Sequence, residues 1–432
     1  MKSGNPFKMM LLICLGMAGC DDGDSGGAES SAPDAQISDM AMDGGGGGET
    51  DAEIMNTPDA EVDAGPMLDQ PYTAILDLPE VPFNYANPEI PDHFRVETLR
   101  FAGQTTVVFE DNTPEDNPTT DHGATLGRVL FYDKHLSFNG TVSCASCHKA
   151  ELGFSDDRVL SEGFEGGDTG RHSMGLANAR FYRDGMFFWD QRAATLEEQV
   201  LEPFQDPVEM GMTLEGLLER VRLGDYYPPL FESAFGDDEI TAERISKALA
   251  QFIRSMVSAT SPYDDGRAQV ASRGDDFPNF TFEENRGKFL FVNPPPLGGL
   301  GCFFCHQGEA FIAFEATNNG LDATNKIDKG YGEVTGEETD MGKFKVPSLR
   351  NVGLRAPYMH DGRFATLEEV IDHYSDGLQP NPNLGPPFGV RNGRATRLNL
   401  SNDEKSALVA FLHTLTDLDM VNDPKFSDPF IE

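Results

Sequence analysis

Four of the six cysteines fall in two copies of one pattern, in which two residues separate a pair of cysteines and a histidine follows directly. The copies are Cys144-Ala145-Ser146-Cys147-His148 and Cys302-Phe303-Phe304-Cys305-His306. This spacing is the attachment signal for c-type haem, because two thiols form thioether bonds to the porphyrin while the adjacent imidazole reaches the iron. The sequence therefore predicts two covalently bound haems, with His148 and His306 as axial ligands.

A zinc site and a thioredoxin-like redox pair are the alternatives for these cysteines. A structural zinc site takes four ligands and gives no reason for a repeated pentapeptide. A redox pair of this spacing is not usually followed by histidine. The other two cysteines, Cys14 and Cys20, lie at the N-terminus, so none remains for a disulfide. Haem attachment, which takes place outside the cytoplasm, explains both copies.

Similar helix-forming segments precede the two patterns. Gly127-Arg128-Val129-Leu130-Phe131 stands before the first, and Gly287-Lys288-Phe289-Leu290-Phe291 before the second. We predict that each forms a helix closing on one haem edge, with a loop leading to the cysteines. Apolar residues at helical spacing predict another helix within 241–258, with Thr241 as its N-cap. Two more helices are expected at 367–374 and 403–415.

The repeat predicts a mainly helical fold of two cytochrome-c-like domains, each with one covalent haem. We place the N-terminal haem domain at 76–262 and the C-terminal haem domain at 263–432. Ser261-Pro262 and the polar run from Asp264 to Asp276 mark the boundary. A chain of 432 residues has room for two such domains and a tail.

Residues 1–19 have the features of a lipoprotein-type signal peptide. Lys2 and Lys8 precede an apolar run that is too short to cross a bilayer as a helix. The end of this stretch, Met17-Ala18-Gly19-Cys20, resembles a bacterial lipobox, with cleavage before Cys20 and lipid on its sulfur. We therefore expect a periplasmic protein that meets a membrane only through a lipid anchor at Cys20.

Residues 20–75 form an acidic tether rich in glycine and aspartate. No lysine or arginine occurs between Lys8 and Arg95. Such a composition buries too little apolar area to order the chain, so we expect disorder here. The whole chain has a formal net charge of −39, which argues against nucleic-acid binding and against a polybasic membrane patch. Basic redox partners would be attracted to this surface.

The region around and between the haem patterns resembles the bacterial dihaem cytochrome c peroxidase and MauG family, over about residues 120–415. The resemblance rests on motifs in the family's order: Leu136-Ser137, Phe188-Trp189-Asp190-Gln191-Arg192, Leu196-Glu197-Glu198-Gln199, Asp206-Pro207-Val208-Glu209-Met210, Val346-Pro347-Ser348-Leu349-Arg350-Asn351 and Ala356-Pro357-Tyr358-Met359-His360-Asp361-Gly362. It implies an oxidoreductase acting on peroxide, with the active site at the domain interface. The first haem would be peroxidatic and the second would transfer electrons.

The resemblance also implies roles for three side chains. Glu209 matches the family's catalytic carboxylate over the first haem, where a base moves a proton between the two oxygens of hydrogen peroxide. An apolar pocket would raise its pKa by desolvation. Gln199 matches an amide that positions peroxide in the same pocket. Trp189, the only tryptophan in the chain, matches the residue that relays charge between the haems.

The second haem departs from the peroxidase pattern. Well-known peroxidases place a methionine ligand at the end of the motif that reads Leu367-Glu368-Glu369-Val370-Ile371-Asp372-His373-Tyr374 here. Tyr374 at that position is the MauG arrangement, in which a hard oxygen donor favours high iron oxidation states. His373, one residue away, and Met359 are the competing candidates.

Two further family sites are altered. The loop between Glu162 and Arg171 contains no histidine to cap the first haem, so either that haem is open or His172 takes the place. His172 also falls where the family often has an asparagine ligand of calcium. The main-chain carbonyls of Arg355 and Pro357 match the other calcium ligands, but calcium prefers oxygen to an imidazole.

Three functions follow from these observations. The first is a peroxidase that reduces hydrogen peroxide to water with electrons from a periplasmic donor such as a small cytochrome c. The second is a MauG-like oxidase that modifies residues of a protein substrate, and the third is a plain dihaem electron carrier. Glu209 argues against the carrier, and Tyr374 favours the second function over the first.

Overall fold

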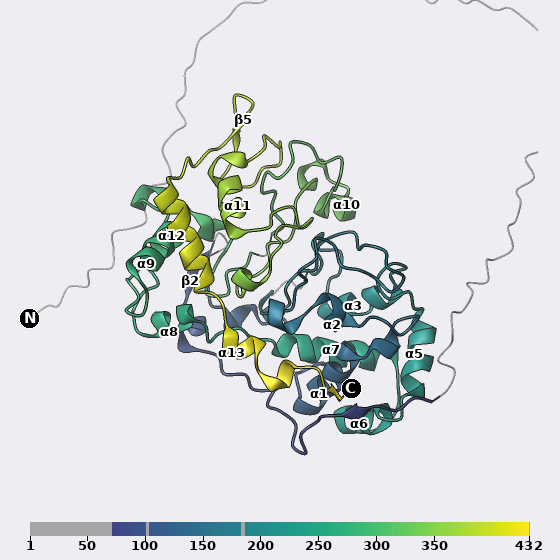
Figure 1. Cartoon of the computed structure of the whole chain (residues 1–432). Helices are drawn as coiled ribbons and strands as arrows, with labels where there is room; N and C mark the ends of the chain where they lie inside the picture. The colour runs from purple at the N-terminus through teal and green to yellow at the C-terminus, as the bar shows by residue number, and fades with distance from the viewer. Residues whose placement is uncertain (1–70, 101–102, 183–185, 314, 432) are drawn as a thin grey trace, which may run out of the picture. The chain divides into compact units, whose positions relative to one another are not determined.

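The computed structural model describes residues 71–100, 103–182, 186–313 and 315–431 (Figure 1). The signal peptide, the predicted anchor Cys20 and nearly all of the predicted tether lie outside the described residues. Within the described ranges, no helix is both long and apolar enough to cross a membrane.

The fold is mainly helical, as predicted, with long loops. The α-helices are α1 (Asp121–Tyr132), α2 (Cys144–Cys147), α3 (Leu196–Gln199), α4 (Glu202–Gln205), α5 (Leu214–Leu223), α6 (Tyr227–Phe235), α7 (Ala242–Ser255), α8 (Pro262–Ala268), α9 (Phe282–Val292), α10 (Tyr331–Thr335), α11 (Leu367–Asp372), α12 (Asn402–His413) and α13 (Leu418–Val421). The strands form short antiparallel pairs: β1 (Ile75–Leu76) with β6 (Phe430–Ile431), β2 (Thr98–Arg100) with β3 (Gly103–Thr105), and β4 (Val390–Arg391) with β5 (Arg394–Ala395).

Helices α1 and α7 pack together in a first hydrophobic core (Figure 1). Thr241 caps α7 as predicted, because its side chain accepts a hydrogen bond from the main-chain nitrogen of Arg244. The two helices touch at Gly127, where an added Cβ would lie 2.0 Å from the carbonyl oxygen of Ala248. Glycine is therefore required for this close approach.

Helices α9 and α12 repeat this arrangement in a second core (Figure 1). An added Cβ on Gly287 would lie 1.8 Å from the carbonyl oxygen of Ala407. The helices predicted at 367–374 and 403–415 are α11 and α12, and a π-helical turn, His373–Gly377, continues α11. Each segment that precedes a haem pattern is thus a helix crossing a later one at a glycine.

The predicted boundary run from Asp264 to Asp276 is helical at its start. Helix α8 begins there because Ser261 and Asp264 form a capping box with Pro262 at the first helical position. Asp264 is buried, and Nη2 of Arg350 donates a 2.9 Å hydrogen bond to its Oδ1. The chain also returns to the first core near its end, where Phe426 packs against that cluster.

Candidate functional site

The first cysteine pattern forms helix α2, whose start is fixed by reciprocal hydrogen bonds between Ser143 and Ser146. His148 follows, and its Nδ1 donates a hydrogen bond of 3.0 Å to the carbonyl oxygen of Phe154. This bond leaves Nε2 with its lone pair, as in most metal-binding histidines. Burial lowers the pKa of His148, so its imidazole is neutral at pH 7 and able to bind iron.

The second pattern forms a 3₁₀ turn at Cys302–Phe304. Gly301 enters this turn with a φ of +78°, and an added Cβ would lie 2.8 Å from the ring of Phe304, so only glycine fits. Burial lowers the pKa of His306 to about 4, which leaves a neutral imidazole here as well. The two patterns thus present the same donor set on different local backbones.

A cavity of about 530 Å³ opens beside the first pattern. The residues that the sequence predicts around the first haem all line it: Cys144, Cys147, His148, Trp189, Gln199 and Glu209. Apolar side chains from α1 and α7 complete much of the wall: Phe131, Leu249 and Ile253. The structure therefore brings together attachment residues and catalytic candidates that lie up to 65 positions apart in the sequence.

The loop that carries Glu209 is held from both sides. The main-chain nitrogen of Glu209 donates to Oδ1 of Asp206 at 3.1 Å, and its carbonyl oxygen accepts from the nitrogen of Phe164 at 3.1 Å. An added Cβ on Gly163 would lie 1.7 Å from the carbonyl oxygen of Val208. The glycine-rich loop between Glu162 and Arg171 therefore packs directly on the loop of Glu209.

Burial in the cavity wall raises the pKa of Glu209 to about 7. The carboxylate of Asp206 adds to this rise, and the guanidinium of Arg192 opposes it. A carboxyl group with a pKa near the working pH can both accept a proton and return it. Glu209 is therefore suited to general acid–base chemistry in this cavity.

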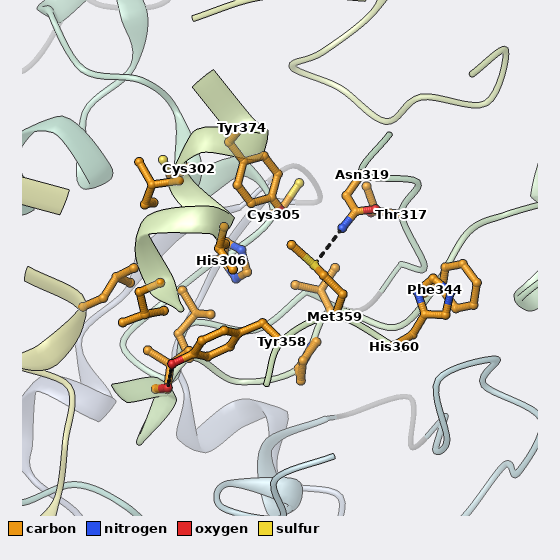
Figure 2. Close-up of a pocket in the computed structure, with 18 of the residues that line it drawn as sticks. Cys302, Cys305, His306, Thr317, Asn319, Phe344, Tyr358, Met359, His360 and Tyr374 are labelled. Atoms are coloured by element: carbon orange, nitrogen blue, oxygen red, sulfur yellow. Dashed lines mark hydrogen bonds between the residues drawn. The ribbon is translucent and has the colours of Figure 1, made fainter. Parts of the chain in front are cut away.

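A second cavity, of about 220 Å³, lies beside the second pattern. Cys302, Cys305 and His306 line it together with Tyr374 and Met359, the two side chains that the sequence offers as the other iron ligand (Figure 2). The side chain of the third candidate, His373, is turned to another partner, because its Nε2 donates to the carbonyl oxygen of Asn319 at 2.9 Å.

The two cavities share part of their walls. The side chains of His172, Met174, Trp189 and Lys345 line both. Nε1 of Trp189 donates a 2.8 Å hydrogen bond to the carbonyl oxygen of His172. The carbonyl oxygen of Trp189 in turn accepts from the nitrogen of Lys345 at 2.8 Å. Trp189 is thus fixed in the wall between the two cavities, and its relay role stays a prediction.

A salt-bridge network anchors the loop of Trp189. Arg171 donates two hydrogen bonds of 2.8 Å to the carboxylate of Asp328, and its Nη1 lies 2.7 Å from Oδ2 of Asp190, the residue after Trp189. A planar guanidinium bonded to two carboxylates restricts the geometry of both. The network therefore ties the tryptophan loop to the segment around residue 328.

No sequence pattern predicts a role for Lys345, although it directly precedes the Val346 motif. Its side chain is buried, donates a hydrogen bond to the carbonyl oxygen of Met186 at 2.9 Å and lies 3.2 Å from the ring centroid of Tyr182. Burial lowers the pKa of Lys345 well below its usual value. No local pattern marks this position, because its partners lie about 160 residues earlier in the chain.

His172 is engaged by protein groups. Its Nδ1 donates to the carbonyl oxygen of Arg158 at 3.1 Å, and its Nε2 lies 3.3 Å from the hydroxyl of Ser155. Arg355 and Pro357 line the second cavity. Among the residues that the structure describes, no group of three or more His, Cys, Asp or Glu side chains is placed to hold a metal ion. The calcium site, whose other ligands are main-chain carbonyls, stays a prediction.

The residues around both cavities fit covalently held haem. Burial raises the pKa of the thiols, to about 12 for Cys144 and Cys302 and about 11 for Cys147 and Cys305, so an uncharged thioether suits these sites. In the second cavity, Nε of the buried Arg355 has no hydrogen-bond partner among the described residues. An anionic group such as a haem propionate would supply one.

These features are those of a mainly helical c-type cytochrome, with two haem-attachment patterns in cavities that share a wall. One cavity also holds a carboxyl group whose pKa is raised to about 7. The family model of di-haem cytochrome c peroxidase matches residues 121–271. The chain is 36% identical over 306 residues to the methylamine utilization protein MauG of Methylorubrum extorquens, covering 70% of this chain and 80% of that protein. It is 33% identical over 303 residues to the cytochrome c551 peroxidase of Nitrosomonas europaea, covering 68% and 79%.

The chain therefore belongs to the di-haem cytochrome c peroxidase family, and it is an oxidoreductase that acts on peroxide. The crystal structure of a MauG-like protein associated with microbial copper homeostasis matches with a TM-score of 0.64 and 36% identity, covering 74% of this chain and 96% of that one. The diheme peroxidase BthA of Burkholderia thailandensis shares the fold, with a TM-score of 0.60 at 22% identity.

Proposed function

We propose that this protein is a dihaem c-type peroxidase that reduces hydrogen peroxide to water with electrons from a small periplasmic donor such as a cytochrome c. The observation that carries the proposal is the position of Glu209, which lines the same cavity as Cys144, Cys147 and His148 and has a pKa raised to about 7. A plain electron carrier has no use for such a group. Haem iron, when bound, supplies the site for peroxide and the electrons that reduce it.

The protein groups of the first cavity manage the proton. Ionised Glu209 accepts the proton of the peroxide oxygen nearer the iron and returns it to the outer oxygen, which leaves as water. Gln199, in the same wall, orients the peroxide through its amide. The apolar side chains of Leu249 and Ile253 exclude bulk water, which keeps the pKa of Glu209 high.

Electrons reach the first cavity from the second, and Trp189 in the shared wall relays them. The hydrogen bond from its Nε1 to His172 and the tie of its loop to Arg171 keep the indole in one orientation. We assign residues 76–262 to a peroxidatic unit and residues 263–432 to an electron-entry unit. The last segment of the second unit, near Phe426, packs in the first core.

A MauG-like oxidase is the second candidate, and Tyr374 is the observation that favours it. This tyrosine lines the second cavity, and an oxygen ligand there stabilises oxidised iron. Such a protein stores oxidising equivalents and withdraws electrons from residues of a protein substrate. The two candidates share the peroxide chemistry of the first cavity and differ in the source of the electrons.

The proposed location is the periplasm, with a lipid anchor on Cys20 and an acidic tether between the anchor and the enzyme. The lipobox-like end of the signal peptide and the absence of lysine and arginine from 9 to 94 support this assignment. Donor and peroxide are both available in that compartment, and c-type haem is attached there.

The test uses the fully ferric holoprotein, reduced small cytochrome c and hydrogen peroxide in a stopped-flow instrument. A peroxidase oxidises the cytochrome in many turnovers, and Glu209→Gln loses most of this rate. If turnover is negligible but peroxide still changes the haem spectrum, the peroxidase proposal is wrong. The MauG-like oxidase, which needs a protein substrate, is then the better assignment. If peroxide does not change the spectrum of the ferric protein, both the peroxidase and the oxidase proposals are wrong.

A further inference from the structure

Two chemically different metal-binding side chains, Tyr374 and Met359, reach the second cavity from separate segments (Figure 2). Tyr374 lies in the π-helical turn after α11, and Met359 lies in the loop before it. The phenolate of a tyrosine is a hard donor that favours oxidised iron, whereas a thioether is a soft donor that favours reduced iron. The cavity therefore holds a suitable ligand for each oxidation state.

Asn319 lines the same cavity and contacts one of these side chains directly. Its Nδ2 donates a hydrogen bond of 3.4 Å to Sδ of Met359 (Figure 2). The carbonyl oxygen of Asn319 accepts a hydrogen bond from Nε2 of His373, the residue before Tyr374. Asn319 thus holds the thioether of Met359 and is tied, through His373, to the segment that carries Tyr374.

The backbone of Met359 is strained. Its φ is +78°, in the left-handed region that non-glycine residues seldom adopt and that persists only where neighbouring structure imposes it. Both neighbours are anchored: the nitrogen of Tyr358 donates to the carbonyl oxygen of Phe364 at 2.8 Å, and His360 stacks on Phe344 at 3.7 Å. These contacts hold the thioether in the cavity. Its bond to Asn319 is easily exchanged, because sulfur is a weak acceptor.

We propose that Tyr374 and Met359 are alternative axial ligands of the second haem, selected by its oxidation state, and that Asn319 is the positioning residue that holds Met359 while Tyr374 is bound. The proposal rests on the proposed function, in which electrons enter through this haem. With haem bound, delivery of one electron would release the oxygen of Tyr374, which would take one proton from solvent. The Sδ lone pair of Met359 would replace it as the ligand, and loss of the electron would reverse both changes.

The exchange gives each ligand a separate task. With Met359 bound, the reduction potential rises, which favours acceptance of an electron from the donor. With Tyr374 bound, the oxidised state is stabilised after the electron has passed on. Met359→Leu should therefore lower the reduction potential of the second haem by at least about 59 mV. For a one-electron couple this is a tenfold change in the equilibrium constant for reduction.

The first experiment is iron-edge X-ray absorption on the wild-type holoprotein, oxidised and then fully reduced. We expect a sulfur neighbour of iron in the reduced protein that is absent from the oxidised one, and its loss in Met359→Leu. Met420→Leu is the matched control. Sδ of Met420 also accepts from an asparagine, Asn351, at 3.7 Å, but Met420 packs in the first core and lines neither cavity.

Asn319 is tested separately. Asn319→Leu removes the amide donor from Met359, so we expect the sulfur neighbour already in the oxidised protein, and Asn319→Gln should restore its dependence on oxidation state. A reduced wild-type protein without a sulfur neighbour, or an unchanged potential in Met359→Leu, would overturn the proposal. Failure of the proposed function looks different: the sulfur signal still follows the oxidation state, but reduced cytochrome c is not turned over with peroxide.

Discussion

Nε1 of Trp189 donates a 2.8 Å hydrogen bond to the carbonyl oxygen of His172, and both residues line both haem cavities. The bond spans 17 positions in the sequence and turns the indole edge toward the segment that follows the glycine-rich loop. The ring of His360 lies edge-on to the indole, with centroids 6.4 Å apart. An aromatic group is thus fixed in the wall that the two cavities share.

Replacement of Trp189 by phenylalanine should slow electron transfer between the cavities at least tenfold. Phenylalanine keeps much of the ring packing but is far harder to oxidise, and it has no donor for the His172 carbonyl. The measurement is stopped-flow absorbance of protein with only the second haem reduced, mixed with peroxide. Trp189→Tyr should recover part of the rate, because the ring of tyrosine is oxidised more easily than that of phenylalanine. An unchanged rate in Trp189→Phe would mean that the indole is only packing.

The raised pKa of Glu209 predicts a pH profile. The protonated acid cannot accept a proton, so the rate of reaction with peroxide should rise as pH increases through about 7. Glu209→Gln should lower the rate at pH 8 by about 100-fold, within the range for loss of a general base, and flatten the profile. A profile in the variant that still rises through pH 7 would assign the titration to another group.

Asp206→Asn is the matched control for this profile. The carboxylate of Asp206 helps to raise the pKa of Glu209, and its Oδ1 accepts from the main-chain nitrogens of Val208 and Glu209. Asparagine keeps an acceptor for those bonds but removes the charge. The midpoint of the profile should therefore move to lower pH while the rate at pH 8 is retained. A shift in the other direction would show that Asp206 acts through loop geometry.

Covalent haem content can be assigned to each cysteine pair. Cys302→Ala combined with Cys305→Ala should reduce the haem that survives denaturation from two per chain to one, because a thioether cannot form without a thiol. The measurement is the pyridine haemochrome spectrum of acid-acetone-extracted protein, normalised to chain concentration. Cys144→Ala with Cys147→Ala should give the same loss. Content that stays at two in either variant would contradict attachment at that pair.

Local patterns in the sequence predict the parts of the structure that depend on near neighbours. Helix α7 and its Thr241 cap follow from apolar spacing and a residue three positions away, and the cysteine patterns encode haem attachment within five residues. Asn319 and Lys345 could not be found in this way. Their partners Met359 and Met186 lie about 40 and 160 positions away, and only the folded chain brings them together. Asp264 begins the polar run that the sequence predicts as a domain boundary, and its burial against the remote Arg350 could not be found for the same reason.

The two glycine crossings predict where the fold is least tolerant of added volume. A methyl group on Gly127 or Gly287 would lie about 2 Å from a carbonyl oxygen of α7 or α12, so the helices must separate. Gly127→Ala and Gly287→Ala should each destabilise the protein by about 1–3 kcal/mol or more, the usual range for overpacking. Gly170→Ala and Gly389→Ala are matched controls, since an added Cβ there meets nothing within 4 Å.

Denaturant unfolding of the holoprotein, followed by the Soret band and by far-UV circular dichroism, measures these effects. If the two cores unfold as separate units, Gly127→Ala shifts one transition to lower denaturant concentration and Gly287→Ala shifts the other. A single transition that both variants lower equally would mean that the cores unfold together. This outcome has a structural basis in the segment near Phe426, which follows α12 of the second core and packs in the first. If Gly127→Ala and Gly287→Ala are as stable to denaturant as the two control variants, the helix pairs can separate without a loss of stability.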